Sequence, residues 1–194
     1  GGAVVLNGGE AYFTNVLFSN NRVSFGGSNN QVGFGGAVLL SNGSDPNSTD
    51  YDYSDAMFVN CIFRENGING NSNGAAGHGA VIHANDGTGF EILQSKFERN
   101  YLNVSGGSSS YADALITIFA GDTAPNMSWR DDYPVPIIHQ SLFEDNYIES
   151  DGDALSSLIA SNAPLSFYNN LVINNYVGGK GANTMIALSA DKDQ

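Results

Sequence analysis

Apolar and polar residues follow one another along this chain in a pattern that recurs five times. In each repeat an apolar anchor residue stands three places before an asparagine. A second apolar residue stands five places before the anchor, and an aliphatic residue comes two places after the asparagine. Self-similarity at about 30 to 45 residues is typical of solenoids, in which each repeat buries its apolar face against its neighbours. The anchors are Phe18, Phe63, Phe97, Phe143 and Val172, and the asparagines are Asn21, Asn66, Asn100, Asn146 and Asn175.

The apolar runs within each repeat predict short β-strands. They are about four to six residues long and follow a period near two, which favours strands over helices. A β-helix with three short strands in each coil accounts for them. In the first coil we expect strands near residues 3–6, 12–18 and 23–25. The five-residue step from Phe13 to Phe18 predicts a bend at Asn15, because asparagine tolerates the left-handed backbone that such a corner requires.

The repeated amide residues are interpreted as structural. Coils that stack at about 4.8 Å place equivalent residues over one another. The five asparagines of the repeat would then hydrogen-bond along the axis as a ladder. A second amide ladder is expected three places before the anchors, unless both sets of residues serve only the turn conformation. Its members are Asn15, Asn60, Gln94, Gln140 and Asn169.

Charged residues fill the two positions between anchor and asparagine in the middle repeats. Arg64 aligns with Glu98, and Glu65 aligns with Arg99, so opposite charges face each other between coils two and three. We expect cross-strand pairs worth roughly 0.2–1 kcal/mol each on an exposed, solvated face. They are interpreted as stabilisers and not as catalytic carboxylates.

A Gly/Asp-Ala-aliphatic triplet precedes each anchor and begins at Gly2, Gly36, Gly79, Asp113 and Asp153. In this alignment Asp113 and Asp153 occupy one column of adjacent coils. Two stacked carboxylates repel each other unless a cation or a donor intervenes. A calcium site is one interpretation, and separate hydration or turn capping by each aspartate is the other.

The charge balance narrows the classes of function. Twenty acidic residues against seven basic ones give a net charge of −13. This speaks against binding of nucleic acid, because neutralisation of phosphates supplies most of that affinity. No run of about 18 apolar residues occurs, so we expect no membrane-spanning segment in this chain. The single cysteine, Cys61, has no partner for an internal disulfide and is expected to be a small, inert residue in a packed column.

Two insertions form the expected binding surface. Residues 41–55 and 121–136 leave the same edge of coils two and four, about 10 Å apart, and would line a shallow cleft. Aromatic and acidic side chains there can bind sugars or a partner protein, unless the loops only decorate the surface. These side chains are Tyr51, Tyr53, Trp129, Asp131, Asp132 and Tyr133. Four N-glycosylation sequons, close to the number expected by chance, begin at Asn42, Asn47, Asn103 and Asn126.

Catalytic and metal-binding constellations do not stand out in the sequence. His78, His83 and His139 fall in different columns of the repeat, so the spacing of metal ligands does not appear. Polysaccharide-degrading enzymes rely on clustered acids. The pair Asp131 and Asp132 beside Arg130 is the best candidate for such a cluster.

Gly-Gly-Ala-Val at 1–4 and 35–38, alternating with Phe-x-x-Asn at 18–21, 63–66, 97–100 and 143–146, resembles the repeats of the polymorphic outer membrane protein family. More broadly, the chain is similar to the pectin-lyase-like superfamily. The resemblance covers nearly the whole chain and implies an all-β, right-handed parallel β-helix of about five to six coils. It also implies surface exposure and a role in adhesion. The chain departs from the pattern at Asp113, Asp153 and Val172.

We therefore expect residues 1–194 to be one β-helix segment of a longer repeat protein, located outside the cell or on its surface. The expected function is a non-enzymatic structural or adhesive module, such as a filament or matrix building block. Its partners would be other copies, surface or matrix proteins, or glycans, and it would need no cofactor, with calcium left open. The alternative is a carbohydrate-active enzyme that uses the cleft between the two insertions.

Overall fold

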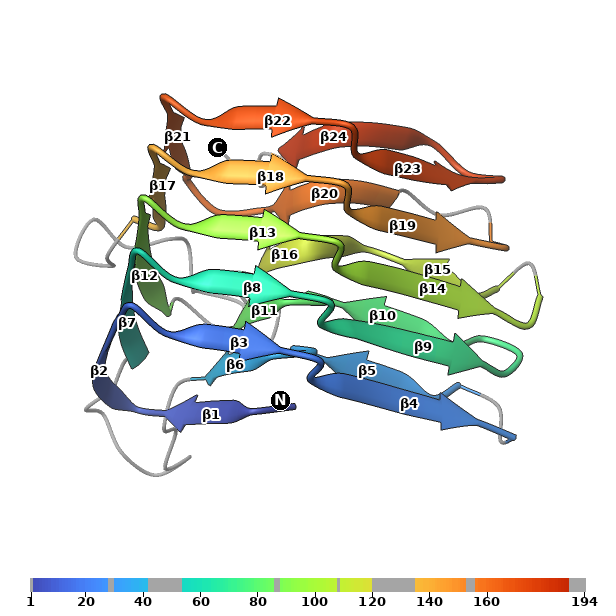
Figure 1. Cartoon of the computed structure of the whole chain (residues 1–194). Coiled ribbons are helices and arrows are strands. Elements are labelled where there is room, and N and C mark those ends of the chain that lie inside the picture. The colour runs from blue at the N-terminus through green and yellow to red at the C-terminus, as the bar shows by residue number, and fades with distance from the viewer. Residues whose placement is uncertain are drawn as a thin grey trace.

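The computed structural model describes residues 2–27, 30–41, 54–85, 88–107, 109–119, 135–152 and 156–188. Throughout these residues the chain is all-β, and its coils stack as a parallel β-solenoid (Figure 1). Each strand pairs in parallel with the equivalent strands of the coils before and after it. The predicted fold class is confirmed.

The strands of the described residues form five sheets, which we number by their first strand. Sheet 1 holds β1 (Val4–Asn7), β6 (Val38–Ser41), β11 (Ile82–Asn85), β16 (Ala114–Phe119), β20 (Ser156–Ser161) and β24 (Asn183–Leu188). Sheet 2 holds β2 (Gly9–Thr14), β7 (Ser54–Val59), β12 (Gly89–Leu93), β17 (Ile137–His139) and β21 (Ser166–Tyr168). Sheet 3 holds β3 (Leu17–Ser19), β8 (Ile62–Arg64), β13 (Lys96–Glu98), β18 (Leu142–Glu144) and β22 (Leu171–Ile173). Sheet 4 holds β4 (Arg22–Gly26), β9 (Gly67–Asn71), β14 (Tyr101–Ser105), β19 (Tyr147–Ser150) and β23 (Tyr176–Gly179), and sheet 5 holds β5 (Val32–Phe34), β10 (Ala76–His78) and β15 (Tyr111–Ala112).

The prediction of three strands per coil is wrong. A corner at Asn15 divides the expected strand 12–18 into β2 and β3, and sheet 5 adds a strand that was not expected. A second corner separates β3 from β4. The first corner, between sheets 2 and 3, has left-handed φ values of 50° to 58° in every coil, beginning with Asn15. The second corner, between sheets 3 and 4, has φ values of 52° to 58°. Glu65, Arg99 and Asp145 occupy the second corner. The sequence pattern identified this column of charged residues but did not predict its left-handed backbone. Glutamate and arginine are uncommon in this conformation and gave no signal in the sequence.

An asparagine follows each second corner, and these asparagines form a continuous hydrogen-bonded ladder inside the solenoid. Asn66 Nδ2 donates to Asn100 Oδ1 at 3.1 Å, and Asn100 Nδ2 donates to Asn146 Oδ1 at 3.0 Å. Each side chain also serves backbone groups of the preceding coil. Asn100 Oδ1 accepts from the backbone N–H of Asn66, and Asn100 Nδ2 donates to the carbonyl oxygen of Phe63. The ladder thus satisfies backbone groups that the corner leaves outside the sheets.

The first corner carries an equivalent ladder, at positions where the sequence suggested only small packed residues. Ser95 Oγ accepts from the backbone N–H of Cys61 at 3.0 Å, and Ser141 Oγ accepts from that of Ser95 at 3.1 Å. Asn170 Oδ1 continues the series by accepting from the N–H of Ser141 at 2.9 Å. Cys61 is buried, as predicted, and burial raises the pKa of its thiol. At the corner residue itself, Asn60 Nδ2 donates to Asn15 Oδ1.

The core is built from columns of identical or similar apolar side chains. The four phenylalanine anchors stack ring on ring, with centroids 4.6 to 4.8 Å apart and interplanar angles of 5° to 10°. Val172 continues the column in the next coil. The columns at Phe13 and at Val23 also pair in the predicted register through all five coils.

The Gly/Asp-Ala-aliphatic triplets do not all align as predicted. The triplets predict that Val38 pairs with Val81, but Val38 pairs with Ile82, and Ile82 pairs with Ile116. Coils three and four are therefore shifted by one residue relative to coil two. In coil five Ala114 pairs with Ser157, so the residue next to Asp113 along the column is Ser156. The alignment of Asp113 with Asp153 is therefore wrong, and Asp153 itself lies outside the described residues. Sheet pairing depends on side-chain packing on the inner face, which a match of three small residues does not define.

The charged columns form the predicted pairs, but one member is buried. Arg64 pairs with Glu98, and Arg99 Nε lies 3.3 Å from Glu65 Oε1. Lys96 Nζ reaches both Glu98 at 2.5 Å and Glu144 at 3.0 Å. These cations cover Glu98, which is only 4% exposed, so the expectation of a fully exposed face is wrong at this residue.

Replacing Glu98 by glutamine should flatten the acid side of the stability profile. Hydrogen bonds from Lys96 and then Arg64 lower the pKa of Glu98 below its usual value of 4.5. A carboxylate with a lowered folded-state pKa stabilises the protein above its unfolded pKa, and this contribution is lost as the pH falls through the folded value. The free energy of unfolding should therefore fall less between about pH 7 and about pH 3 in Glu98→Gln than in the wild type. Denaturant titrations measure this, with exposed Glu10→Gln as the control, and equal slopes in all three proteins would contradict the prediction.

Candidate functional site

A hollow on the outer face of sheet 1 is the candidate site. Successive side chains in the central outward column of this sheet become smaller along the solenoid. Leu39 and His83 are followed by Thr117, and then by two alanines, Ala160 and Ala187. The loss of side-chain volume leaves a cavity of about 500 Å³. Its lining is formed by Asp113, Thr117, Ile118, Phe119, Ala160, Ser161, Asn162, Thr184, Ile186, Ala187 and Leu188.

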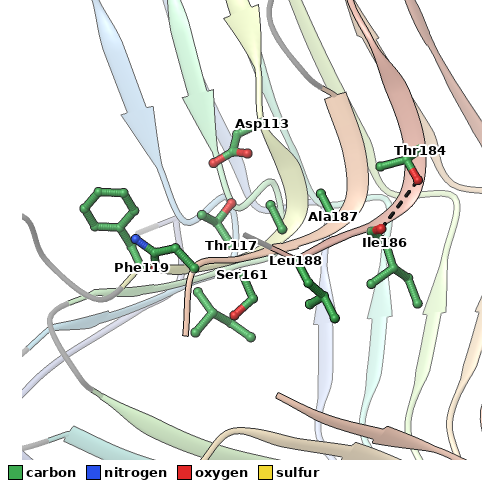
Figure 2. Close-up of a pocket in the computed structure, with 11 residues that line it drawn as sticks. Asp113, Thr117, Phe119, Ser161, Thr184, Ile186, Ala187 and Leu188 are labelled. Atoms are coloured by element: carbon green, nitrogen blue, oxygen red, sulfur yellow. Dashed lines mark hydrogen bonds between the residues drawn. The ribbon is translucent and has the colours of Figure 1, made fainter. Parts of the chain in front are cut away.

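Polar and aromatic groups border an apolar floor in this hollow. The Asp113 carboxylate and the Thr117 hydroxyl point toward one another, with the Phe119 ring to one side and Thr184 to the other (Figure 2). Thr184 Oγ1 donates to the carbonyl oxygen of Ile186 at 3.4 Å. Phe119 is 37% exposed and Leu188 is 65% exposed, so both present apolar surface to a ligand.

Asp113, which lies between β15 and β16, belongs to a chain of hydrogen bonds with residues of β10 and β15. Its Oδ2 lies 3.1 Å from Nδ1 of His78, and Nε2 of His78 lies 3.1 Å from the hydroxyl oxygen of Tyr111. In the neutral tautomer with its proton on Nδ1, His78 donates to Asp113 and accepts from Tyr111. Burial, and then the charge of Asp113, raise the pKa of Tyr111, so its hydroxyl stays protonated as a donor.

Two further polar groups beside the hollow are buried. His83 is 4% exposed and packs against Phe34 with ring centroids 4.8 Å apart, while Thr117 is 2% exposed. Within the described part of the chain, His83 Nδ1 and Thr117 Oγ1 have no hydrogen-bond partner. Burial, and then the neighbouring His78, lower the pKa of His83 to about 3. His83 is therefore a neutral group at physiological pH.

The described lining can hold a ligand through one carboxylate, hydroxyl groups and an aromatic ring. Glycoside hydrolysis generally uses two carboxyl groups roughly 5 to 9.5 Å apart, one on each side of the bond that breaks. Among the described residues that line the hollow, one carries a carboxylate, Asp113. Across the described residues, no three His, Cys, Asp or Glu side chains come together as a metal site would require.

The sequence did not bring the members of this site together. Tyr111 and Asp113 lie two residues apart, and the register of sheets 1 and 5 brings His78 of the preceding coil beside them. The three histidines were correctly assigned to different columns, yet the His78 and His83 rings lie only 5.9 Å apart. The alignment of the triplets offered one signal, because it places Asp113 beside Gly79 and therefore close to His78.

Most residues of the predicted cleft lie outside the described residues. Asn103 is described: it lies on β14 and its side chain is exposed, so it is accessible for modification. The remaining predicted site residues outside the described part are Tyr51, Tyr53, Trp129, Asp131, Asp132, Tyr133, Asp153, Asn42, Asn47 and Asn126.

Comparison with known proteins adds no relative to this picture: no family model, curated protein or solved structure matches the chain. In the part of the chain that the structure describes, no helix is long and apolar enough to cross a membrane.

Proposed function

We propose that this chain is a structural and adhesive module of an extracellular or cell-surface protein. The observation that supports this proposal is the pair of side-chain ladders that connect each coil to the next. The asparagine ladder runs from Asn21 to Asn175, with each link formed by one amide donating to the next. A solenoid connected in this way is a stiff rod whose outer faces are available for contacts.

The repeat pattern supports a more specific form of the proposal. Its resemblance to polymorphic outer membrane protein repeats favours a surface protein whose rod presents adhesive faces. Other copies, matrix proteins and glycans are the proposed partners. N-glycosylation at exposed Asn103 would fit such a location.

A carbohydrate-active function is the second candidate. One observation favours it: the hollow combines an acceptor, Asp113, with an exposed aromatic ring, Phe119, as sugar-binding sites commonly do. Because the described lining residues include one carboxylate, we favour recognition of a glycan over its cleavage.

Incubation with a panel of neutral and acidic polysaccharides should give no products above background. The readouts are new reducing ends and unsaturated sugars, measured for the wild type and for Asp113→Asn, Asp131→Asn and Asp132→Asn. Turnover by the wild type that any of these substitutions abolishes would overturn the non-enzymatic proposal.

The adhesive part is tested by coating beads with the folded chain. Retention on immobilised matrix proteins, cell surfaces and glycans should exceed that of beads coated with the heat-unfolded chain. The unfolded chain has the same composition and the same charge of −13, so the difference isolates the folded surface. Equal retention of both coatings contradicts adhesion.

A further inference from the structure

We infer that the hollow on the outer face of sheet 1 binds a primary ammonium group carried on an aliphatic stem, as in a lysine side chain of a partner protein or a free diamine. This inference rests on the proposed adhesive function and makes it more specific, because it assigns a binding site and a class of ligand. The inference stands on the charge, the shape and the buried polar groups of the hollow.

The charge of the hollow favours a cation. Asp113 is the one charged residue among the described residues that line the hollow, and these include no lysine or arginine that would oppose a positive ligand. The whole chain carries −13, which attracts cations toward any exposed carboxylate. A carboxylate offers about four acceptor sites on its two oxygens, so Asp113 can accept from His78 and from a ligand ammonium together.

The shape of the hollow favours a slender apolar stem behind the charge. Ala160 and Ala187 form a floor of methyl groups next to Thr117. Phe119 and Leu188 add exposed apolar surface at the border. Long amine side chains bury their methylene groups along such surfaces while the charged end meets a carboxylate.

The unpartnered hydroxyl of Thr117 supplies the independent indication of a ligand. Thr117 lines the hollow, is 2% exposed, and in the described residues its Oγ1 lacks a hydrogen-bond partner. A buried polar atom without a hydrogen-bond partner destabilises the protein. A ligand that donates a hydrogen bond to this atom relieves the destabilisation. An ammonium group has three donors and can serve the Asp113 carboxylate and the Thr117 oxygen together.

The residue beside Thr117 in the outward column of sheet 1 does not repel a cationic ligand. His83 lies beside Thr117 in the sheet, and its buried imidazole is neutral at physiological pH. The described lining therefore presents one negative charge, the unpartnered Thr117 hydroxyl and an apolar floor.

Titration of the folded chain with Nα-acetyl-lysine methylamide tests this inference. The probe should shift the amide resonances of Thr117, Ala160 and Ala187 in a saturable way, and added salt should weaken the binding. The norleucine analogue, which has the same stem without the charge, should not bind. 1,4-Diaminobutane forms the second arm: tighter binding of the diamine indicates a free polyamine, and tighter binding of the lysine derivative indicates a protein partner.

Two substitutions separate the contributions of charge and shape. Asp113→Asn should weaken binding by about tenfold or more, because it removes the charged acceptor. Ala160→Leu should abolish binding by filling the floor while leaving the charge unchanged. Asp145→Asn removes one negative charge at the exposed corner between sheets 3 and 4, and its affinity should equal that of the wild type.

Three outcomes overturn the inference: equal binding of the norleucine analogue, equal weakening by Asp145→Asn and Asp113→Asn, or resonance shifts that lie outside sheet 1. Shifts of the same amides by an oligosaccharide, without an effect of the amine, would assign the hollow to a glycan instead. If the isolated chain binds no amine, this inference fails, but the proposed rod and its adhesive function are unaffected. Loss of bead retention with intact amine binding contradicts the proposed function alone.

Discussion

Replacing Asn100 by alanine should lower the free energy of unfolding by about 3–5 kcal/mol, since the substitution removes four hydrogen bonds in the interior. Asn100 is fully buried. Its Oδ1 accepts from the N–H and from the side-chain amide of Asn66, and its Nδ2 donates to Phe63 O and to Asn146 Oδ1. Alanine leaves the backbone N–H of Asn66 and the carbonyl of Phe63 buried without these partners. Such unsatisfied groups cost more than an average hydrogen bond contributes.

Denaturant titration and thermal unfolding measure the effect of Asn100→Ala. For a chain of this length the midpoint temperature should fall by roughly 10 °C. Asn103→Ala is the matched control, because Asn103 lies on the following strand with its side chain exposed, and its effect should stay within about 0.5 kcal/mol. Similar losses in both variants would show that the ladder does not stabilise the solenoid.

Replacing Phe97 by alanine should destabilise the chain by about 3–5 kcal/mol. The Phe97 ring is fully buried and is stacked between Phe63, at 4.6 Å and 10°, and Phe143, at 4.7 Å and 7°. Alanine opens a cavity between two rings that the coils above and below hold in place. The surroundings can collapse only slightly, because Phe63 and Phe143 are anchored by their own strands.

A graded series distinguishes packing from simple hydrophobicity in this column. Phe97→Leu keeps most of the apolar volume but loses the ring stacking, so its loss should be smaller than that of Phe97→Ala. Leu171→Ala removes an apolar side chain that is 55% exposed on the outer face of sheet 3, and should cost less than about 1 kcal/mol. The prediction is contradicted when Phe97→Ala costs no more than Leu171→Ala.

Columns with strong, repeated residue types could be aligned from the sequence. The phenylalanine anchors and the asparagines three places later recur at constant spacing, and the structure pairs them coil by coil in that register. Their spacing also placed the bend at Asn15, which has a left-handed φ of 58°. The triplets were harder to align, because glycine, alanine and an aliphatic residue match at several offsets. In coil five Ala114 pairs with Ser157 and not with Ala154, an offset of three residues that separates Asp113 from the column partner assigned to it.

The sequence by itself determined the solenoid, because a residue that must pack against its own equivalent in the next coil repeats its type at every turn. Only the tertiary structure decided the hollow, the Asp113–His78–Tyr111 chain and the burial of Glu98. These features depend on side chains from different repeats that differ in type, such as the step from His83 to Thr117 and then to Ala160. No period marks them along the chain. They arise where the stacking of coils brings unlike neighbours together and leaves space between them.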